Sequence, residues 1–216
     1  MLIWLDPPQR ADHLLLGERD RCAYLAEYPV GAAYREHTLA RLIWDFKCAP
    51  ALARNDWRRQ RRKQQAIEKM AAWLRAAVTR KQAECCTWVP IPPSKQRGDP
   101  DFDDRLWWTL SLAFRGYDLD LRRLVCQSES TGSDHSAVNR LSEQALYSML
   151  QVDVRELQQQ ALRKRVVLFD DVLTSGKHFK CCQRRLLECV PQMQVFGLFL
   201  LRRLPQRCAR SLGRAW

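Results

Sequence analysis

The sequence predicts an α/β fold built on a central, mainly parallel sheet flanked by helices. The chain has 216 residues, of which 46% are hydrophobic and 28% charged, enough to bury one full-sized core. From about residue 38 onward, helical patterns alternate with short apolar segments, as in sheets covered by helices. The uninterrupted apolar run at 166–169, VVLF, is typical of a parallel strand buried on both faces.

The elements follow in order along the chain. Helices are expected over 38–46, 66–78, 103–114, 139–150 and 176–189; in 66–78 and 103–114 apolar residues recur at helical spacing. Strands are expected over 85–91, 121–126, 165–169 and 194–201, and the polar run 127–140 should be a loop. Residues before 38 show no clear pattern. We therefore divide the chain into an N-terminal segment or small hood, 1–50, and a core, 51–216.

Charge and cysteine content narrow the function classes. A net charge of +12 and a pI near 9.6 favour anionic partners: phosphorylated small molecules, nucleic acid or an acidic protein. The nine cysteines show no CxxC spacing, so we expect reduced, buried thiols and no disulfide scaffold. The apolar start MLIWL has no basic segment before it, and the run 195–201 is too short to span a bilayer. A soluble, cytoplasmic protein without membrane contact is expected.

The stretch VVLFDDVLTSGKH, residues 166–178, carries the main functional signal. Asp170 and Asp171 follow the apolar strand, and parallel strands deliver binding residues at their carboxyl ends. Thr174, Ser175 and Gly176 then form a turn before a helix, where hydroxyl and N–H groups can hold a phosphate. The ordinary alternative is that the aspartates and hydroxyl residues simply cap the helix.

Other phosphate motifs do not fit this stretch. A P-loop requires a glycine where Asp171 stands and a Ser or Thr where His178 stands. A phosphatase of the haloacid dehalogenase type requires a second aspartate where Val172 stands. A dinucleotide site requires spaced glycines that the stretch lacks.

The stretch resembles the signature of the type I phosphoribosyltransferases: apolar residues, two acids, then a Thr/Ser-Gly phosphate loop. The resemblance implies binding of phosphoribosyl pyrophosphate (PRPP) with Mg²⁺. Asp170 and Asp171 would contact the ribose hydroxyls and act on the metal through water. The 5-phosphate would be lined by Thr174, Ser175, Gly176, Lys177 and His178.

The resemblance is nearest to the ComF-like, competence-associated branch, through residues 34–50 and 88–99. It implies that the loop after the strand at 85–91 binds pyrophosphate with Ser94, Lys95 and Arg97; the alternative is a solvated basic loop. Residues 127–140 would close over the substrate. The sequence departs from this branch in having only Cys22 and Cys48 in its first fifty residues, so no zinc ribbon is expected. It also has His178 in place of Thr or Ser, and four acids within 98–106, of which Asp103 or Asp104 caps a helix or helps bind metal.

A second class of function is a module that binds nucleic acid or a nucleoprotein partner, in a DNA-related or defence-related role. Its support is the basic run 54–65, RNDWRRQRRKQQ. The candidate contacts in this run are Trp57, Arg58, Arg59, Arg61, Arg62 and Lys63. The alternative is the solvated start of a long helix. The acceptor substrate, the retention of transfer activity and the oligomeric state stay open.

Overall fold

The computed structural model describes residues 1–28, 37–131 and 141–204. Its main sheet has six strands in the order β1-β2-β8-β7-β3-β4. Among the strand pairs that the described residues form in this sheet, only β1–β2 is antiparallel. The strands are β1 (Ile3–Trp4), β2 (Arg21–Tyr28), β3 (Cys86–Pro90), β4 (Asp120–Leu121), β7 (Arg165–Leu173) and β8 (Gln194–Arg203). The predicted α/β fold with a mainly parallel sheet is confirmed.

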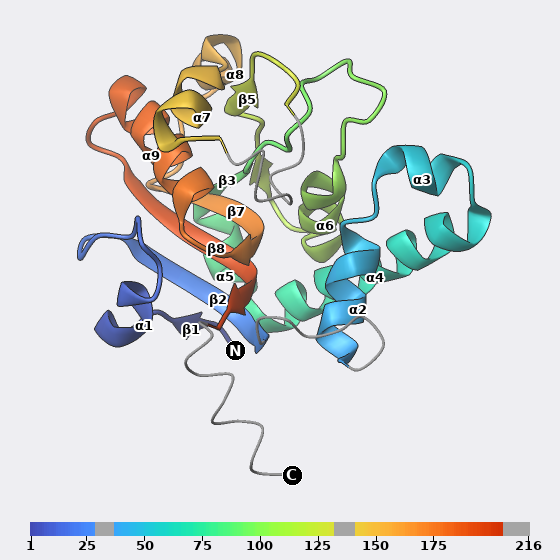
Figure 1. Ribbon diagram of the computed structural model, residues 1–216. Coiled ribbons are helices and arrows are strands. Elements are labelled where there is room, and N and C mark those ends of the chain that lie inside the picture. The colour runs from blue at the N-terminus through green and yellow to red at the C-terminus, as the bar shows by residue number, and fades with distance from the viewer. Residues whose placement is uncertain (29–36, 132–140, 205–216) are drawn as a thin grey trace.

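Helices cover both faces of this sheet (Figure 1). One face carries α2 (Thr38–Phe46), α4 (Trp57–Ala77), α5 (Arg80–Glu84) and α6 (Arg105–Ala113), and α3 (Pro50–Arg54) packs against α4 farther from the sheet. The other carries α7 (Glu143–Met149), α8 (Val154–Gln159) and α9 (Lys177–Cys189), together with a small antiparallel sheet of β5 (Val125–Gln127) and β6 (Leu150–Val152). The short α1 (Pro7–Ala11) lies beside β1 and β2.

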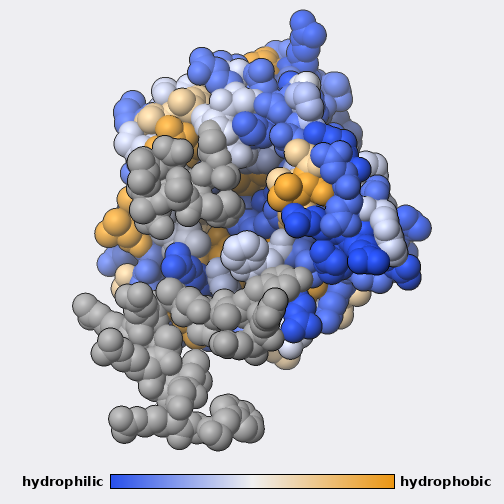
Figure 2. Space-filling view, turned by 45° about the vertical axis from the view of Figure 1, so that its right-hand side comes forward, coloured by the Kyte–Doolittle hydropathy of each residue, from blue (hydrophilic) through white to orange (hydrophobic). Residues whose placement is uncertain are grey.

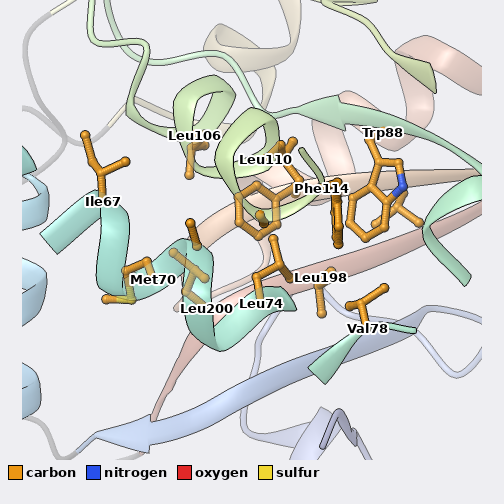
Figure 3. Packing of buried hydrophobic residues seen from close by; sticks show 14 of the residues in the cluster. Ile67, Met70, Leu74, Val78, Trp88, Leu106, Leu110, Phe114, Leu198 and Leu200 are labelled. Carbon is orange, nitrogen blue, oxygen red and sulfur yellow. The ribbon is translucent and has the colours of Figure 1, made fainter. Parts of the chain in front are cut away.

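Each face has its own hydrophobic core. Between the sheet and α4, side chains of α4 pack against α6 and β8 (Figure 3). The residues drawn there include Ile67, Met70, Leu74, Leu106, Leu110, Phe114, Leu198 and Leu200. On the opposite face, Phe179 and Leu186 of α9 pack against Val166 and Leu168 of β7. Burial of each such side chain contributes roughly 1.5–3 kcal/mol, so β7 is fixed from both sides.

Most predicted elements are confirmed, but the strand expected over 121–126 is wrong. Residues Asp120–Leu121 join the main sheet, whereas Val125–Gln127 pair with β6. The cause is Arg122, whose guanidinium is buried in an ion pair with Asp120. A charged pair at this point ends the regular strand, and the chain crosses to the small sheet.

Two boundaries shift in ways that matter for the site. The strand expected over 165–169 extends to Leu173, because pairing with β8 continues through Val172 and Leu173. The aspartates therefore lie within a strand and not after its end. Helix α4 begins at Trp57 and not at residue 66, and the carboxylate of Asp56 caps it by accepting from the N–H groups of Arg58 and Arg59.

The N-terminal segment contributes to the central sheet, because β2 pairs in parallel with β8. The division of the chain at residue 50 stays a prediction. The loop predicted over 127–140 begins one residue later in the structure, because Gln127 belongs to β5, and residues 132–140 lie outside the described part. No helix within the described ranges is long and apolar enough to cross a membrane.

The described cysteines are all free thiols. Those that are buried are Cys22, Cys86, Cys181 and Cys182. The others in the described ranges are exposed or partly exposed, so the prediction of buried thiols holds for only part of the set.

Candidate functional site

The two adjacent aspartates of β7 point to opposite faces of the sheet, as successive residues of a strand do. Asp171 is buried on the α6 side, where its carboxylate contacts Arg105. Asp170 is partly buried on the α9 side. There, burial and then the nearby charge of Asp170 raise the pKa of the Cys182 thiol. The adjacent acids therefore have different surroundings and cannot serve as one equivalent pair.

Asp171 lies at the centre of a buried ion-pair network. Its Oδ2 accepts from Nε and a terminal nitrogen of Arg105 at 3.1 and 2.6 Å, and its Oδ1 lies 2.9 Å from Nζ of Lys47. Arg105 also donates to Asp103, which accepts from Lys63. Burial alone would raise the pKa of Asp171, but Lys47 and Arg105 outweigh it and hold that pKa well below its usual range. Below, these five residues are called the Asp171 network.

Asp170 has the opposite electrostatics. Burial, followed by the negative charge of Asp171, raises the pKa of Asp170 to about 7. Its Oδ1 accepts the backbone N–H of Asp171 at 2.8 Å. A carboxyl group that titrates near neutral pH can give up its proton when a metal ion or another cation approaches. Strongly perturbed acids of this kind are common at binding sites, so Asp170 is the better candidate of the two for a ligand contact.

The turn from β7 to α9 has the features of an anion-binding loop. Gly176 caps the helix with φ +82°, a left-handed conformation that favours glycine. The hydroxyl of Ser175 accepts the N–H of Lys177 at 3.3 Å. Helix α9 has 13 residues, and its first turn carries N–H groups that lack partners within the helix and the positive end of the helix dipole.

The predicted phosphate residues do not contribute equally to this turn. Thr174 is exposed, whereas Ser175 and His178 are partly buried. The ammonium of Lys177 donates to the backbone carbonyl of Leu141 at 2.7 Å. That contact directs the lysine side chain toward the segment just before α7.

The second predicted loop begins beside the first, because β3 and β7 are neighbours in the sheet. The N–H of Ile91 donates to the carbonyl of Phe169 at 2.9 Å, one residue before Asp170. Ser94 follows, and its carbonyl accepts the N–H of Thr131 at 2.8 Å. The start of the predicted closing loop therefore lies against the predicted pyrophosphate loop.

Lys95 and Arg97 line a small pocket of about 30 Å³ that is partly open to solvent. Asp103 and Trp107 line it too. Since Asp103 shares Arg105 with Asp171, the pocket and the carboxyl end of β7 are joined by one chain of ion pairs. The two loops thus occupy the same edge of the sheet, although none of residues 174–178 is among those that line this pocket.

The acids at 98–106 have structural partners. Asp103 accepts the backbone N–H of Arg105 at 3.2 Å through Oδ1, a contact typical of a helix start. Asp104 occupies the N-cap position of α6 without a side-chain capping bond, and its carboxylate pairs with Arg123 at 2.6 Å. Asp103 therefore fits the capping alternative, and Asp104 is part of an ion pair.

The basic run forms the exposed first half of α4, which extends away from the sheet with α3 in Figure 1. Trp57 is 65% exposed, and the guanidinium of Arg58 lies 5.5 Å from its ring centroid. Arg59 and Arg62 form ion pairs with Asp56 and Asp45 at 3.3 and 3.4 Å. Arg61 is exposed as well. Figure 2, which turns this side toward the viewer, shows a mainly hydrophilic surface on its right.

Lys63 is the one residue of the predicted nucleic-acid set that turns inward. Its ammonium donates to the carbonyl of Cys48 at 2.6 Å and to Asp103 at 2.7 Å. It is part of the Asp171 network, and reaching a nucleic-acid phosphate would break those contacts. The structure therefore does not bring it together with the exposed arginines.

Sequence reasoning missed the partners of Asp171 and a contact from the N-terminal segment. Lys47 and Arg105 come from α2 and α6, and nothing in the stretch 166–178 indicates them. His13 contacts the carbonyl of Thr174 from the N-terminal segment. The only available signal was the presence of single basic residues at the end of one helix and the start of another.

Comparison with models of known protein families gives no match for this chain, and comparison with curated proteins gives none either. The geometry of the site and the motif at 166–178 are therefore what indicate the function.

Proposed function

We propose that the protein binds a 5-phosphorylated ribose compound, with PRPP as the best candidate, at the carboxyl end of β7. The observation that carries the proposal is that a carboxyl of raised pKa is followed closely by an anion-binding turn: Asp170 lies near the end of β7, and the turn at 174–176 connects β7 to α9. A phosphorylated sugar needs both, since its phosphate is bound by N–H and hydroxyl donors and its diol by a carboxylate acceptor.

The roles implied by the family resemblance change in one respect. Both oxygens of Asp171 are engaged by Lys47 and Arg105, so this carboxylate does not fit a ribose or metal ligand. We assign the ribose contact to Asp170 alone. The phosphate contacts go to Thr174, Ser175, Gly176 and the first turn of α9, with His178 beside them.

Magnesium fits this site only as an ion held largely by the ligand. Mg²⁺ prefers oxygen ligands, keeps several waters and is commonly bound through one or two carboxylates and substrate phosphates. Within the described residues no group of three or more His, Cys, Asp or Glu is arranged to hold a metal. Asp170 would contact the ion through water, and the ion would supply charge neutralisation at the pyrophosphate. Ser94, Lys95 and Arg97 are the proposed pyrophosphate contacts.

Equilibrium binding of labelled PRPP tests the proposal. We expect binding in Mg²⁺ that weakens in EDTA, and displacement by unlabelled ribose 5-phosphate. Pyrophosphate alone should compete less well if the turn at 174–178 holds the 5-phosphate. Absence of PRPP binding in Mg²⁺, or displacement by pyrophosphate but not by ribose 5-phosphate, would contradict it. The acceptor of any phosphoribosyl transfer stays open.

A second candidate function is binding of single-stranded nucleic acid by the exposed half of α4. The observation that favours it is the exposure of Trp57 together with Arg58, Arg59, Arg61 and Arg62. An aromatic ring can stack on a base while arginines contact the backbone. Arg58 and Arg61 are the sharper candidates, because Arg59 and Arg62 pair with aspartates.

A salt titration of oligonucleotide binding tests this second function. Each phosphate contact should contribute a log–log slope of about −0.7 on single strands and about −0.9 on duplex. Reversing two charges, Arg58→Glu with Arg61→Glu, should weaken binding and flatten the slope, whereas Lys63→Gln should leave the slope unchanged. An oligonucleotide affinity that the charge reversal does not alter would make this surface an ordinary solvated helix face.

A further inference from the structure

The N-terminal segment contacts the turn at 174–176 at three points. The ring of His13 makes a hydrogen bond through Nδ1 to the carbonyl of Thr174. The N–H of Leu15 donates to the carbonyl of Ser175 at 3.0 Å. The side chain of Leu16 lies over Gly176, where an added Cβ would be only 2.7 Å from it. The segment and the turn are therefore closely packed, although more than 150 residues separate them in the sequence.

The protonation of His13 follows from its second partner. Nε of Arg202 donates to Nε2 of His13 at 3.2 Å, and a guanidinium can only donate. Nε2 is thus the acceptor, and in the neutral ring the proton lies on Nδ1, from which it is donated to Thr174. Burial lowers the pKa of His13, as does the charge of Arg202, so the neutral ring is favoured at pH 7.

Arg202 is itself held in place, which fixes the position of His13. It is buried in β8 and forms ion pairs with Asp12 and with Glu27 of β2, the latter at 2.5 Å. Of the charged groups around the His13 ring, Arg202 and Asp12 act on it directly. The ring therefore connects the rigid central sheet to the turn after β7.

These contacts determine where the N–H groups of the turn point. In a trans peptide unit, the carbonyl and the following N–H point in opposite directions. The carbonyl of Thr174 and the N–H of Ser175 share one unit, and the carbonyl of Ser175 and the N–H of Gly176 share the next. Because both carbonyls are directed to the N-terminal segment, both N–H groups point away from it. Successive N–H groups with a common direction form an anion-binding concavity.

We infer that His13 is a positioning residue for the anion loop: with Leu15, it holds the turn so that the N–H groups of Ser175 and Gly176 face the bound phosphate. The inference deepens the proposed function and rests on it, because it takes the phosphate of the ligand to bind at this turn. Leu16 packs against Gly176 and leaves no room for a side chain at position 176.

Two measurements on His13 variants test the inference. The first is amide hydrogen exchange of 174–178 in the ligand-free protein, and the second is affinity for inorganic phosphate and ribose 5-phosphate. Losing the ring's hydrogen bond, worth about 1 kcal/mol net, should make His13→Leu exchange these amides roughly fivefold faster and bind phosphate roughly fivefold more weakly. His13→Asn carries an amide near the position of Nδ1 and should restore most of both.

Val195→Ala is the matched control. Val195 is buried at the amino end of β8, the opposite end of the sheet from the turn, so its truncation lowers stability without touching the loop. It should keep wild-type phosphate affinity. A His13→Leu variant with wild-type exchange and affinity, or an equal loss of affinity in Val195→Ala, would overturn the inference alone. If the wild-type protein binds neither phosphate nor ribose 5-phosphate, the proposed function and the positioning role are both overturned. Faster amide exchange in His13→Leu would then show only that the contact orders the turn.

Discussion

Replacing Asp171 by Asn should destabilise the fold by roughly 3–5 kcal/mol at pH 7, the usual cost of removing one partner from a buried ion pair. The cost arises mainly at Arg105, whose side chain is 15% exposed and would keep Asp103 as its ion-pair partner but lose the negative charge of Asp171. Lys47 is 26% exposed and can turn to solvent. Denaturant unfolding at several pH values measures the effect.

The stability difference between wild type and Asp171→Asn should change with pH in a defined direction. The pKa of Asp171 is lower in the folded state than in the unfolded chain, so its stabilisation is present above the unfolded pKa of about 3.9 and is lost as pH falls toward the folded value. The gap between wild type and Asp171→Asn should therefore shrink below about pH 4. Asp101→Asn is the control, because that carboxylate pairs with Arg54 at the exposed surface and should change stability by less than about 1 kcal/mol. Equal stability of Asp171→Asn and wild type at pH 7 would contradict the network.

Replacing the neighbouring Asp170 by Asn should have the opposite effect and stabilise the fold, by roughly 1–3 kcal/mol at pH 8. The pKa of Asp170 is raised in the folded state to about 7. Between the unfolded and the folded pKa the folded protein binds more protons, so the contribution of Asp170 to stability falls as pH rises through that window. The gain from Asn should thus grow between about pH 4 and pH 7 and level off above.

Asn at position 170 keeps the oxygen that accepts the N–H of Asp171, which makes the variant nearly isosteric. Unfolding curves of wild type and Asp170→Asn, measured side by side at pH 5 and pH 8, test whether the stability gain depends on pH. A stability difference that is the same at both pH values, or a destabilised variant at pH 8, would show that folding does not raise the pKa of Asp170. The opposite signs expected at 170 and 171 mean that a double Asn variant cannot separate ligand binding from folding.

The sequence predicted the sheet and the position of the turn well, because both depend on local patterns. The apolar run at 166–169 identified the central strand, and the Thr-Ser-Gly sequence identified the start of α9. It did not show that β7 continues through both aspartates, since two charged residues interrupt the apolar pattern that marks a buried strand. That continuation depends on pairing with β8, which local sequence does not reveal.

The roles of the two aspartates also depend on distant residues. Arg105 lies 66 positions before Asp171, and the His13 contact to Thr174 spans 161 positions. Neither separation follows a local rule such as helical or strand spacing. A motif alone suggests equal roles for two neighbouring acids. The roles differ here because successive side chains of a strand point to opposite faces of the sheet, and because Lys47 and Arg105 form their ion pairs with Asp171.

The most direct test of the central claim is the affinity of wild type and Asp170→Asn for Mg²⁺-PRPP at pH 8, where the carboxyl of Asp170 is mainly ionised. Calorimetry or equilibrium dialysis can measure both proteins, and the unfolding curves establish that the variant is folded. A hydrogen bond to a charged group is worth about 1.5–3 kcal/mol, so we expect affinity to fall roughly 10- to 100-fold. Wild-type affinity in a folded, stabilised Asp170→Asn protein would contradict the assignment of the ribose contact to Asp170.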